Sequence, residues 1–138
     1  MELSARNYIE TTVTAIKEGL VNAEIHLELK GGRKLASIIT VSSAHRLGLK
    51  EGKTVYAVIK ASNVIVGDFT GQLSARNVIP CKVVSIKKGK VSAEVSLNAG
   101  GQTLVSIITL DSCENMELTR GSKIAAIVKA TDVIIAVD

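Results

Sequence analysis

Apolar and polar residues alternate along much of the chain, and this alternation predicts β-strands. A period of two places successive side chains on opposite faces of a sheet, so that one face is buried and the other is solvated. The pattern is clearest over residues 20–29, and Gly31-Gly32 marks a hairpin turn into the next strand. In the first half we expect strands over residues 2–17, 20–29, 35–41, 54–60 and 61–66.

A short helix is expected between the third and fourth strands. Residues 44–49 follow Ser42 and Ser43, whose side chains suit an N-cap, and Gly48 or Gly52 can end the helix. The second half repeats this order, with strands over residues 73–87, 91–97, 104–110, 123–129 and 131–137 and a helix from Asp111-Ser112 through Leu118.

The two halves are copies of one unit. Leu3-Ser4-Ala5-Arg6-Asn7 returns as Leu73-Ser74-Ala75-Arg76-Asn77, and residues 3–28 match residues 73–98 at 14 of 26 positions. Five strands with a helix between the third and the fourth are typical of an OB-type barrel. The sequence therefore predicts an all-β chain of two tandem OB-like five-stranded Greek-key barrels, each with one short helix. The expected domains are residues 1–68 and 71–138, joined by a tight linker at residues 67–72.

Composition excludes several classes of protein. Apolar residues make up 46% and charged residues 22% of the chain, which is typical of a globular protein. The net charge of +4 is shared evenly, because residues 1–70 carry nine basic against seven acidic residues and residues 71–138 carry eight against six. Because the charges are interspersed, a solvated mixed surface is favoured over a site for nucleic acid or acidic membrane. Units of under 70 residues bury little core alone, so we expect the halves to pack together and the chain to form oligomers.

Cysteine usage and hydropathy suggest the compartment. Cys81 and Cys113 have Thr11 and Ala44 as counterparts in the first half, so neither belongs to the repeated design. Two unmatched cysteines suit a reducing compartment, where they serve as small buried apolar residues. The sequence shows no signal-peptide pattern and no apolar run of membrane-spanning length, so we expect a cytoplasmic protein with no membrane partner.

Both copies also keep polar residues that folding alone does not obviously require. Arginine and lysine only donate hydrogen bonds, and serine and threonine hydroxyls can donate them. Short loops of small residues and helix N-termini add backbone N–H groups. Together these donors suit an oxyanion. They are Ser4, Arg6, Asn7, Thr40, Ser43, Lys60 and Ser62, matched by Ser74, Arg76, Asn77, Thr109, Ser112, Lys129 and Thr131.

None of these donor residues is a carboxylate, and this bears on the kind of anion. A protonated phosphate needs an acceptor for its own O–H group, whereas a fully ionised tetrahedral dianion needs none. The motifs therefore favour molybdate, tungstate or sulfate. Ser4 lies at the start of the first expected strand and Lys60 at the end of the fourth. Within one barrel these two could lie at opposite ends, and on that hypothesis a site that uses both joins two units, within one chain or between chains.

Simpler roles stay open for several of these residues. Arg6 can mark a plain strand entry that pairs with a surface carboxylate, and Ser43 can serve only as a helix cap. Thr40 shares this uncertainty with Ser43. Glu24 and Glu94 are kept by both halves on the polar face of an alternating strand, where we expect surface or interface pairing.

No catalytic or metal-binding group is repeated. His26 corresponds to Ser96 and His45 to Glu114, and both halves preserve neither a nucleophile with a base nor a metal-ligand spacing. We therefore predict that the protein is not an enzyme, that it has no catalytic cofactor, and that its side chains hold no metal ion directly.

At these motifs the chain resembles a known family. A unit of just under 70 residues that opens with Leu-Ser-Ala-Arg-Asn and carries Lys-Ala-Ser/Thr-(Asn/Asp)-Val-Ile near its end resembles the Mop domain. Two such units in tandem resemble the di-Mop molbindins, which are cytoplasmic molybdate-binding proteins, over essentially the whole chain. The resemblance implies OB-like barrels that bind molybdate or tungstate at their interfaces, with tandem members forming trimers.

The resemblance also implies which residues act together. In related di-Mop regulators, the Ser and Arg of the first motif act with the Lys-Ala-Ser phrase of a neighbour. Where the first copy has Asn63 the second has Asp132, and this carboxylate weakens the second site if it faces the anion. Carried over, one implied set is Ser4, Arg6, Asn7, Lys60, Ala61 and Ser62, and the other is Ser74, Arg76, Asn77, Lys129, Ala130 and Thr131. Thr40, Ser43, Thr109 and Ser112 are supporting candidates.

The expected function is therefore cytoplasmic binding, storage and buffering of molybdate or tungstate by a homo-oligomer. The first alternative is an OB-type nucleic-acid-binding module. The net charge permits it, but one Phe, two Tyr and no Trp offer few rings for base stacking. A structural trimer with incidental anion sites is a second alternative. The chain carries neither a helix-turn-helix nor an ATPase motif, so we expect neither DNA control nor transport of its own.

Overall fold

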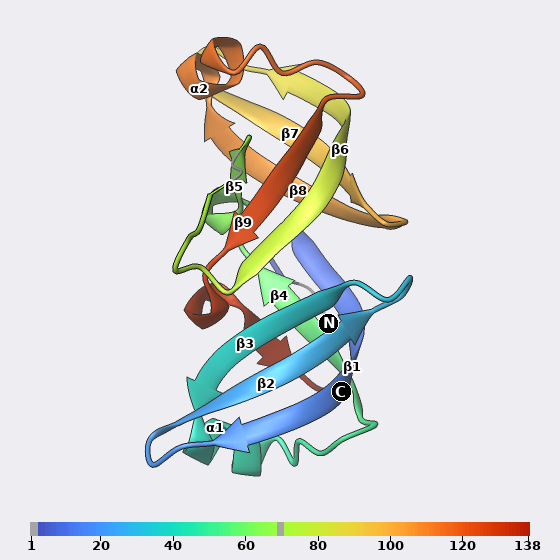
Figure 1. Cartoon of the computed structure of the whole chain (residues 1–138), viewed down its shortest axis with the longest axis vertical. Helices are drawn as coiled ribbons and strands as arrows, with labels where there is room; N and C mark the ends of the chain where they lie inside the picture. The colour runs from blue at the N-terminus through green and yellow to red at the C-terminus, as the bar shows by residue number, and fades with distance from the viewer. Residues whose placement is uncertain (1–2, 69–70) are drawn as a thin grey trace.

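The computed structural model describes residues 3–68 and 71–138, which form two curled antiparallel sheets stacked along the long axis of the molecule (Figure 1). The expected all-β fold is confirmed. Phe69 and Thr70 of the expected linker lie outside the described residues. The first repeat supplies β1 (Asn7–Glu18), β2 (Asn22–Leu29), β3 (Lys34–Thr40), β4 (Thr54–Ile59) and β5 (Ile65–Gly67). The second supplies β6 (Asn77–Lys88), β7 (Ser92–Ala99), β8 (Gln102–Thr109), β9 (Lys123–Val128) and β10 (Ile134–Ala136).

The two repeats exchange their last strands. The strand order is β10-β4-β1-β2-β3 in one sheet and β5-β9-β6-β7-β8 in the other. Ile134 pairs with Val58, and Ile65 pairs with Ile127. Figure 1 shows the same crossing, with the green β5 in the upper sheet and the dark red C-terminal segment in the lower one. Each sheet therefore depends on both copies of the sequence.

A single turn of 3₁₀-helix leads into each exchanged strand. These turns are η1 (Ala61–Asn63) and η2 (Ala130–Asp132), and they pack against β8 and β3 of the opposite repeat. The expectation of continuous strands over residues 61–66 and 131–137 was therefore wrong at their starts. The small side chains of Ala61 and Ala130 are buried at these contacts, which allows the chain to turn there close to the neighbouring sheet.

Two serine side chains form hydrogen bonds with the segments that lead into the exchanged strands. The Ser37 hydroxyl donates to the carbonyl of Val133 at 2.6 Å, and the Ser106 hydroxyl donates to the carbonyl of Val64. Both serines are fully buried. A hydroxyl buried among apolar residues is costly unless it is bonded, so these two positions require the partner segment to be in place.

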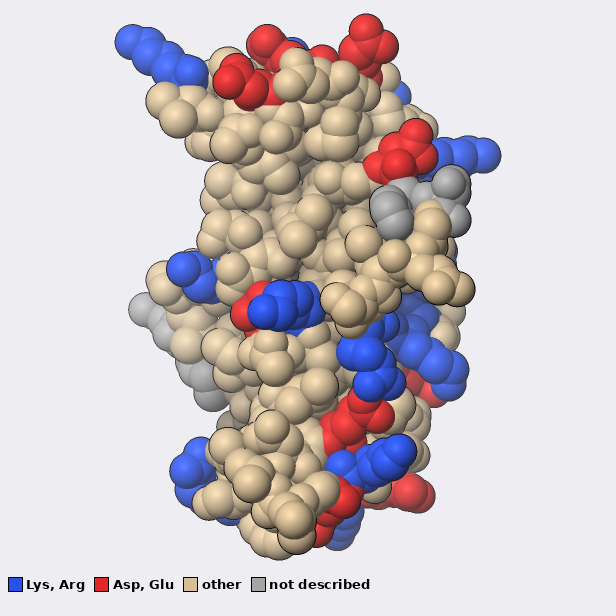
Figure 2. Space-filling model, turned by 60° about the vertical axis from the view of Figure 1, so that its left-hand side comes forward, with Lys and Arg blue, Asp and Glu red and all other residues tan. Residues whose placement is uncertain are grey.

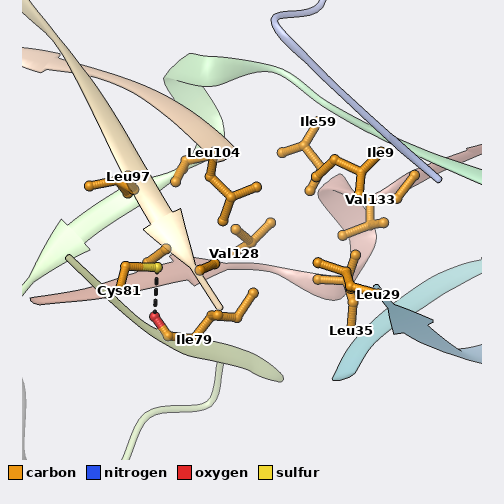
Figure 3. Packing of buried hydrophobic residues seen from close by; sticks show 14 of the residues in the cluster. Ile9, Leu29, Leu35, Ile59, Ile79, Cys81, Leu97, Leu104, Val128 and Val133 are labelled. Atoms are coloured by element: carbon orange, nitrogen blue, oxygen red, sulfur yellow. Dashed lines mark hydrogen bonds between the residues drawn. The ribbon is translucent and has the colours of Figure 1, made fainter. Parts of the chain in front are cut away.

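The buried apolar side chains of both repeats form one cluster. Figure 3 shows Val133, which belongs to the second repeat by sequence, beside Ile9 and above Leu29 and Leu35 of the first. Leu97, Leu104 and Cys81 lie on the other side of the view. The core is therefore continuous across the exchange, which meets the need of two small units to bury apolar surface together.

The short helices follow the third strands but begin earlier than expected. They are α1 (Val41–Arg46) and α2 (Leu110–Asn115). Their N-caps are Thr40 and Thr109, whose hydroxyls accept from the backbone N–H groups of the residues three positions on. The expected caps at Ser42, Ser43, Asp111 and Ser112 were therefore wrong. A threonine in extended backbone at the end of a strand can end that strand and cap the helix.

Candidate functional site

The two motifs of each repeat lie side by side. β1 runs antiparallel to β4, and Asn7 is the register partner of Ile59. Asn77 is likewise the partner of Val128. Antiparallel pairing brings the start of one strand to the end of the other, so the Ser-Ala-Arg segment lies beside the Lys-Ala-Ser/Thr segment. The arrangement that the sequence left open, with Ser4 and Lys60 at opposite ends of one barrel, is therefore not the one observed.

We use the name first cluster for Ser4, Arg6, Asn7, Lys60, Ala61 and Ser62. The second cluster is Ser74, Arg76, Asn77, Lys129, Ala130 and Thr131. In each cluster the serine, the arginine, the lysine and the last hydroxyl residue are exposed, whereas the asparagine and the alanine are buried. The exposed members can therefore reach a ligand through their side chains, and the alanine only through its backbone.

Asn7 and Asn77 attach each cluster to the opposite repeat. The Asn7 amide donates to the carbonyl of Val105 at 2.8 Å and accepts from its N–H at 2.7 Å. Asn77 makes the same two bonds with Ala36, at 2.8 and 2.7 Å. Each side-chain amide thus bonds to both backbone groups of one residue of β8 or β3, as a neighbouring strand would. Both asparagines are almost fully buried, and these bonds give them a structural role.

Arg6 and Arg76 form ion pairs across the repeats. Arg6 contacts Glu94 of β7, and Arg76 contacts Glu24 of β2, in each case through Nη1. The expectation that these two glutamates serve in surface or interface pairing is confirmed. A guanidinium carries five N–H donors, and the arginine side chains stay 50% and 49% exposed. Donors therefore remain for a ligand.

These ion pairs change one argument from the sequence. Neither cluster contains a carboxylate among its own residues, but folding brings Glu94 to Arg6 and Glu24 to Arg76. An acceptor for a protonated anion therefore lies within each cluster's surroundings, and the preference for a fully ionised anion does not follow from the motifs alone. An exposed ion pair contributes at most about 1 kcal/mol, so an anion of higher charge can compete with the glutamate for the arginine.

The second cluster has a further partner that the first lacks. The His26 ring nitrogen Nε2 lies 2.9 Å from a carboxylate oxygen of Glu24, and the matching residue in the other repeat is Ser96. Partial burial acts to raise the pKa of Glu24, but the hydrogen bonds with His26 and Arg76 outweigh it and hold that pKa below its ordinary value. Arg76 and Asn77 border a hollow of about 400 Å³ that His26 and Lys34 also line.

The supporting candidates lie at the helix starts. Thr40 Oγ1 donates to Ser43 Oγ at 2.8 Å, and Thr109 Oγ1 donates to Ser112 Oγ at the same distance. The threonines are therefore the caps, and each serine is bonded to its capping threonine rather than being the cap itself. Ser62 of the first cluster lines a hollow of about 610 Å³ together with Thr109 and Ser112. The structure thus brings the tip of one repeat to the helix start of the other.

The sequence did not reveal the roles of some residues that the structure shows to connect the repeats. Ser37 and Ser106 occupy matched positions in otherwise apolar strands, and this repetition was the available signal. Glu24 and Glu94 were noticed as repeated, but not as partners of the arginines, because alternation places a residue on a face without naming its neighbour.

Metal binding, cysteine reactivity and membrane spanning can each be compared with the structure. Among the described residues there is no group of three or more His, Cys, Asp or Glu side chains that could hold a metal ion. Burial raises the pKa of the Cys81 thiol, and both cysteines are buried and unpaired. Within the described ranges, no helix is both long enough and apolar enough to cross a membrane.

Comparison with family models places two copies of one domain on the chain. The TOBE domain matches residues 3–66 and again residues 73–135. The chain belongs to the TOBE-domain family, and its two copies make it a tandem Mop-domain molbindin. The resemblance seen in the motifs is thereby confirmed.

A solved structure matches this tandem molbindin over its entire length. It is the cytoplasmic molybdate-binding protein ModG in a form with molybdate bound, which is 42% identical, has a TM-score of 0.96, and covers 100% of both chains. The match includes the strand-exchanged arrangement as a whole, because a TM-score near 1 requires both sheets to superpose together.

Curated relatives contain the same repeats in other settings. The molybdenum transport protein ModE of Azotobacter vinelandii is 35% identical over 139 residues, which cover 99% of this chain and 52% of ModE. The chain thus spans about half the length of such relatives. Molybdenum-pterin-binding protein 3 of Clostridium pasteurianum is 48% identical over 66 residues, which are 97% of that protein and 48% of this chain. That relative has the length of a single repeat.

Proposed function

We propose that the chain binds molybdate or tungstate at the two clusters and serves to store and buffer the anion in the cytoplasm. The observation that carries this proposal is the strand register that ends at Asn7–Ile59 and at Asn77–Val128. In both repeats it brings the segment with the serine and the arginine to the same end of the sheet as the segment with the lysine and the second hydroxyl, and the arginine stays half exposed. The full-length likeness to molybdate-bound ModG supports it. The chemistry is binding without catalysis, and no catalytic cofactor enters it.

The residues divide by role. Ser4, Arg6, Lys60 and Ser62 are proposed as side-chain donors to the anion, and Ser74, Arg76, Lys129 and Thr131 as their counterparts. Ala61 and Ala130 contribute backbone N–H groups, because the first N–H groups of a 3₁₀ turn have no partner inside it. Asn7 and Asn77 hold the arginine-bearing segments in place while their amides bind the opposite repeat. Thr40, Ser43, Thr109 and Ser112 remain supporting candidates.

We further propose that the anion is held between copies of the chain in a trimer. Figure 2 shows few Lys, Arg, Asp or Glu side chains over the upper half of one face. Several large apolar side chains are exposed, including Leu20 and Val21 before β2 and Ile134 in β10. Their counterparts in the other repeat include Val91 and Ile65. Exposed apolar surface of this kind is typical of a subunit interface.

Calorimetric titration with molybdate, tungstate and sulfate, alongside mass in solution by light scattering, tests these proposals. We expect saturable binding of molybdate and tungstate, weaker binding of sulfate, and the mass of three chains. A monomer that releases no heat with molybdate would overturn the proposed function. A monomer that binds molybdate would overturn only the trimer.

A further inference from the structure

The two repeats differ on the outer face of their first and fourth strands. In the first repeat Tyr8 of β1 and Tyr56 of β4 stack there, with ring centroids 4.6 Å apart and planes inclined by 9°. The matching residues of the second repeat are Val78 and Ala125. Where the first repeat has two rings, the second has a hollow of about 550 Å³ whose floor is formed by Val78, Pro80 and Ala125.

The rim of this hollow is positively charged. Arg33, Lys82 and Lys123 line it, against a single carboxylate, Asp68. None of the three cations forms an ion pair within the described residues 3–68 and 71–138, whose ion pairs lie elsewhere. In the first repeat, the positions of Lys82 and Lys123 are taken by Thr12 and Thr54, so the charge is special to this side.

The two lysines are arranged at an electrostatic cost. Lys82 of β6 is the direct register partner of Lys123 of β9. Like charges directly opposite one another on neighbouring strands destabilise a sheet. An anion between the two lysines would turn this repulsion into attraction. Asp68 lines the same hollow but forms no ion pair with either lysine.

The third cation comes from the other repeat and is positioned by packing. Arg33 follows the β2–β3 hairpin and is only partly exposed. It lies across Gly100, where an added Cβ would come within 2.7 Å of Arg33 Nε, so a larger residue there would displace the arginine side chain. Gly100 also has a φ of +63°, which favours glycine further. The rim is therefore built from both repeats.

We propose that this hollow is a further binding site, of a different kind from the two clusters, and that it takes a small organic anion with a flat apolar ring. The apolar floor between β6 and β9 takes the ring, in the place that the two tyrosines fill in the first repeat. Arg33, Lys82 and Lys123 take the acidic group. Neither cluster contributes a residue to this site, so it stands whether or not the clusters bind molybdate.

The probe for this site is 8-anilinonaphthalene-1-sulfonate, a flat aromatic anion whose fluorescence rises in apolar surroundings. We expect saturable binding of one probe molecule per chain, weakened at least threefold when potassium chloride is raised from about 50 to about 300 mM, because the contacts are ionic. Molybdate at saturation should leave probe binding unchanged, because the clusters lie elsewhere.

The first repeat supplies the matched variants. Val78→Tyr with Ala125→Tyr copies its stacked rings and should abolish probe binding by filling the hollow. Lys82→Thr with Lys123→Thr copies its hydroxyls and should weaken binding about tenfold or more while leaving the apolar floor. The control is Tyr8→Val with Tyr56→Ala, which opens a hollow whose nearby cation, Lys30, is already paired with Glu10, so it should add no site of comparable affinity.

The fold of each variant is checked by circular dichroism and thermal melting. Lys82 and Lys123 are exposed, so their replacement tests the site without disturbing the core. Absence of saturable probe binding, or binding that survives both the tyrosine pair and the threonine pair, would overturn the proposal and assign the probe to exposed apolar surface in general.

Discussion

The cluster around Arg6 and the cluster around Arg76 share a framework and differ in what surrounds it. In both, a buried asparagine binds a strand of the opposite repeat and a glutamate of that repeat holds the arginine. Around the second cluster, His26 joins the glutamate and Asp132 replaces Asn63. The bonds that cross between repeats are kept in both copies, whereas side chains at the periphery differ.

This difference indicates which part of each cluster is structural. A cross-repeat bond fails if either end changes, so both copies need the same residues at these positions. A peripheral side chain changes only the charge near one cluster. Variants of the shared framework should therefore have larger effects than variants of the side chains that differ.

The largest effect is expected from removing both arginines. Arg6→Ala with Arg76→Ala should abolish most molybdate binding, because each cluster loses its multidentate cation. Stability should change by less than about 1 kcal/mol per site, since the arginine of each ion pair is half exposed. Calorimetric titration and thermal melting measure the two effects. Undiminished uptake by the folded variant would remove these arginines from the site, and each single variant isolates the other cluster.

The asparagines should matter for stability more than any other polar residue of the clusters. Asn7→Ala leaves the N–H and the carbonyl of Val105 without partners at a partly buried position, at a cost of about 1–3 kcal/mol. Asn77→Ala should cost a similar amount through Ala36. Urea unfolding gives the free energies, and the exposed Asn22→Ala is the matched control. A loss no greater than that of the control would contradict the structural role.

Replacing Asp132 should make the clusters more alike. In an Arg6→Ala background, where only the second cluster binds, Asp132→Asn copies Asn63 and removes a negative charge near the anion. We expect molybdate to bind about two- to tenfold more tightly, as befits one charge at a partly exposed position. The reverse change, Asn63→Asp in an Arg76→Ala background, should weaken binding. If neither calorimetric affinity moves, residue 132 does not sense the anion.

The smallest effect concerns the glutamate that His26 joins. Because the pKa of Glu24 is lowered in the folded protein, its ionised form contributes stability above the ordinary value of 4.5, and that stability is lost as pH falls through the folded pKa. Glu24→Gln should therefore lower the melting temperature at pH 7 but make little difference at strongly acidic pH. His26→Ser, which copies the other repeat, should produce a smaller loss at pH 7. A pH-independent difference for Glu24→Gln would rule out this linkage.

The sequence by itself determined the repeat, the strands and the composition of the clusters. Alternation over residues 20–29 predicts β2, and the double occurrence of the Ser-Ala-Arg-Asn phrase marks both clusters, because local pattern and repetition are properties of the chain alone. The family followed from the same phrases. The position of Thr40 as the helix cap was missed because three neighbouring hydroxyls can all serve as caps.

Only the tertiary structure decided which repeat each part joins. β5 and β10 read equally well as strands of their own repeat, and their exchange depends on partners more than 60 residues away in the chain. For the same reason the partners of Arg6 and Asn7, which are Glu94 and Val105, could not be found from spacing. Period and composition fix the face on which a side chain lies, but the residue opposite it is set by the packing of the two sheets.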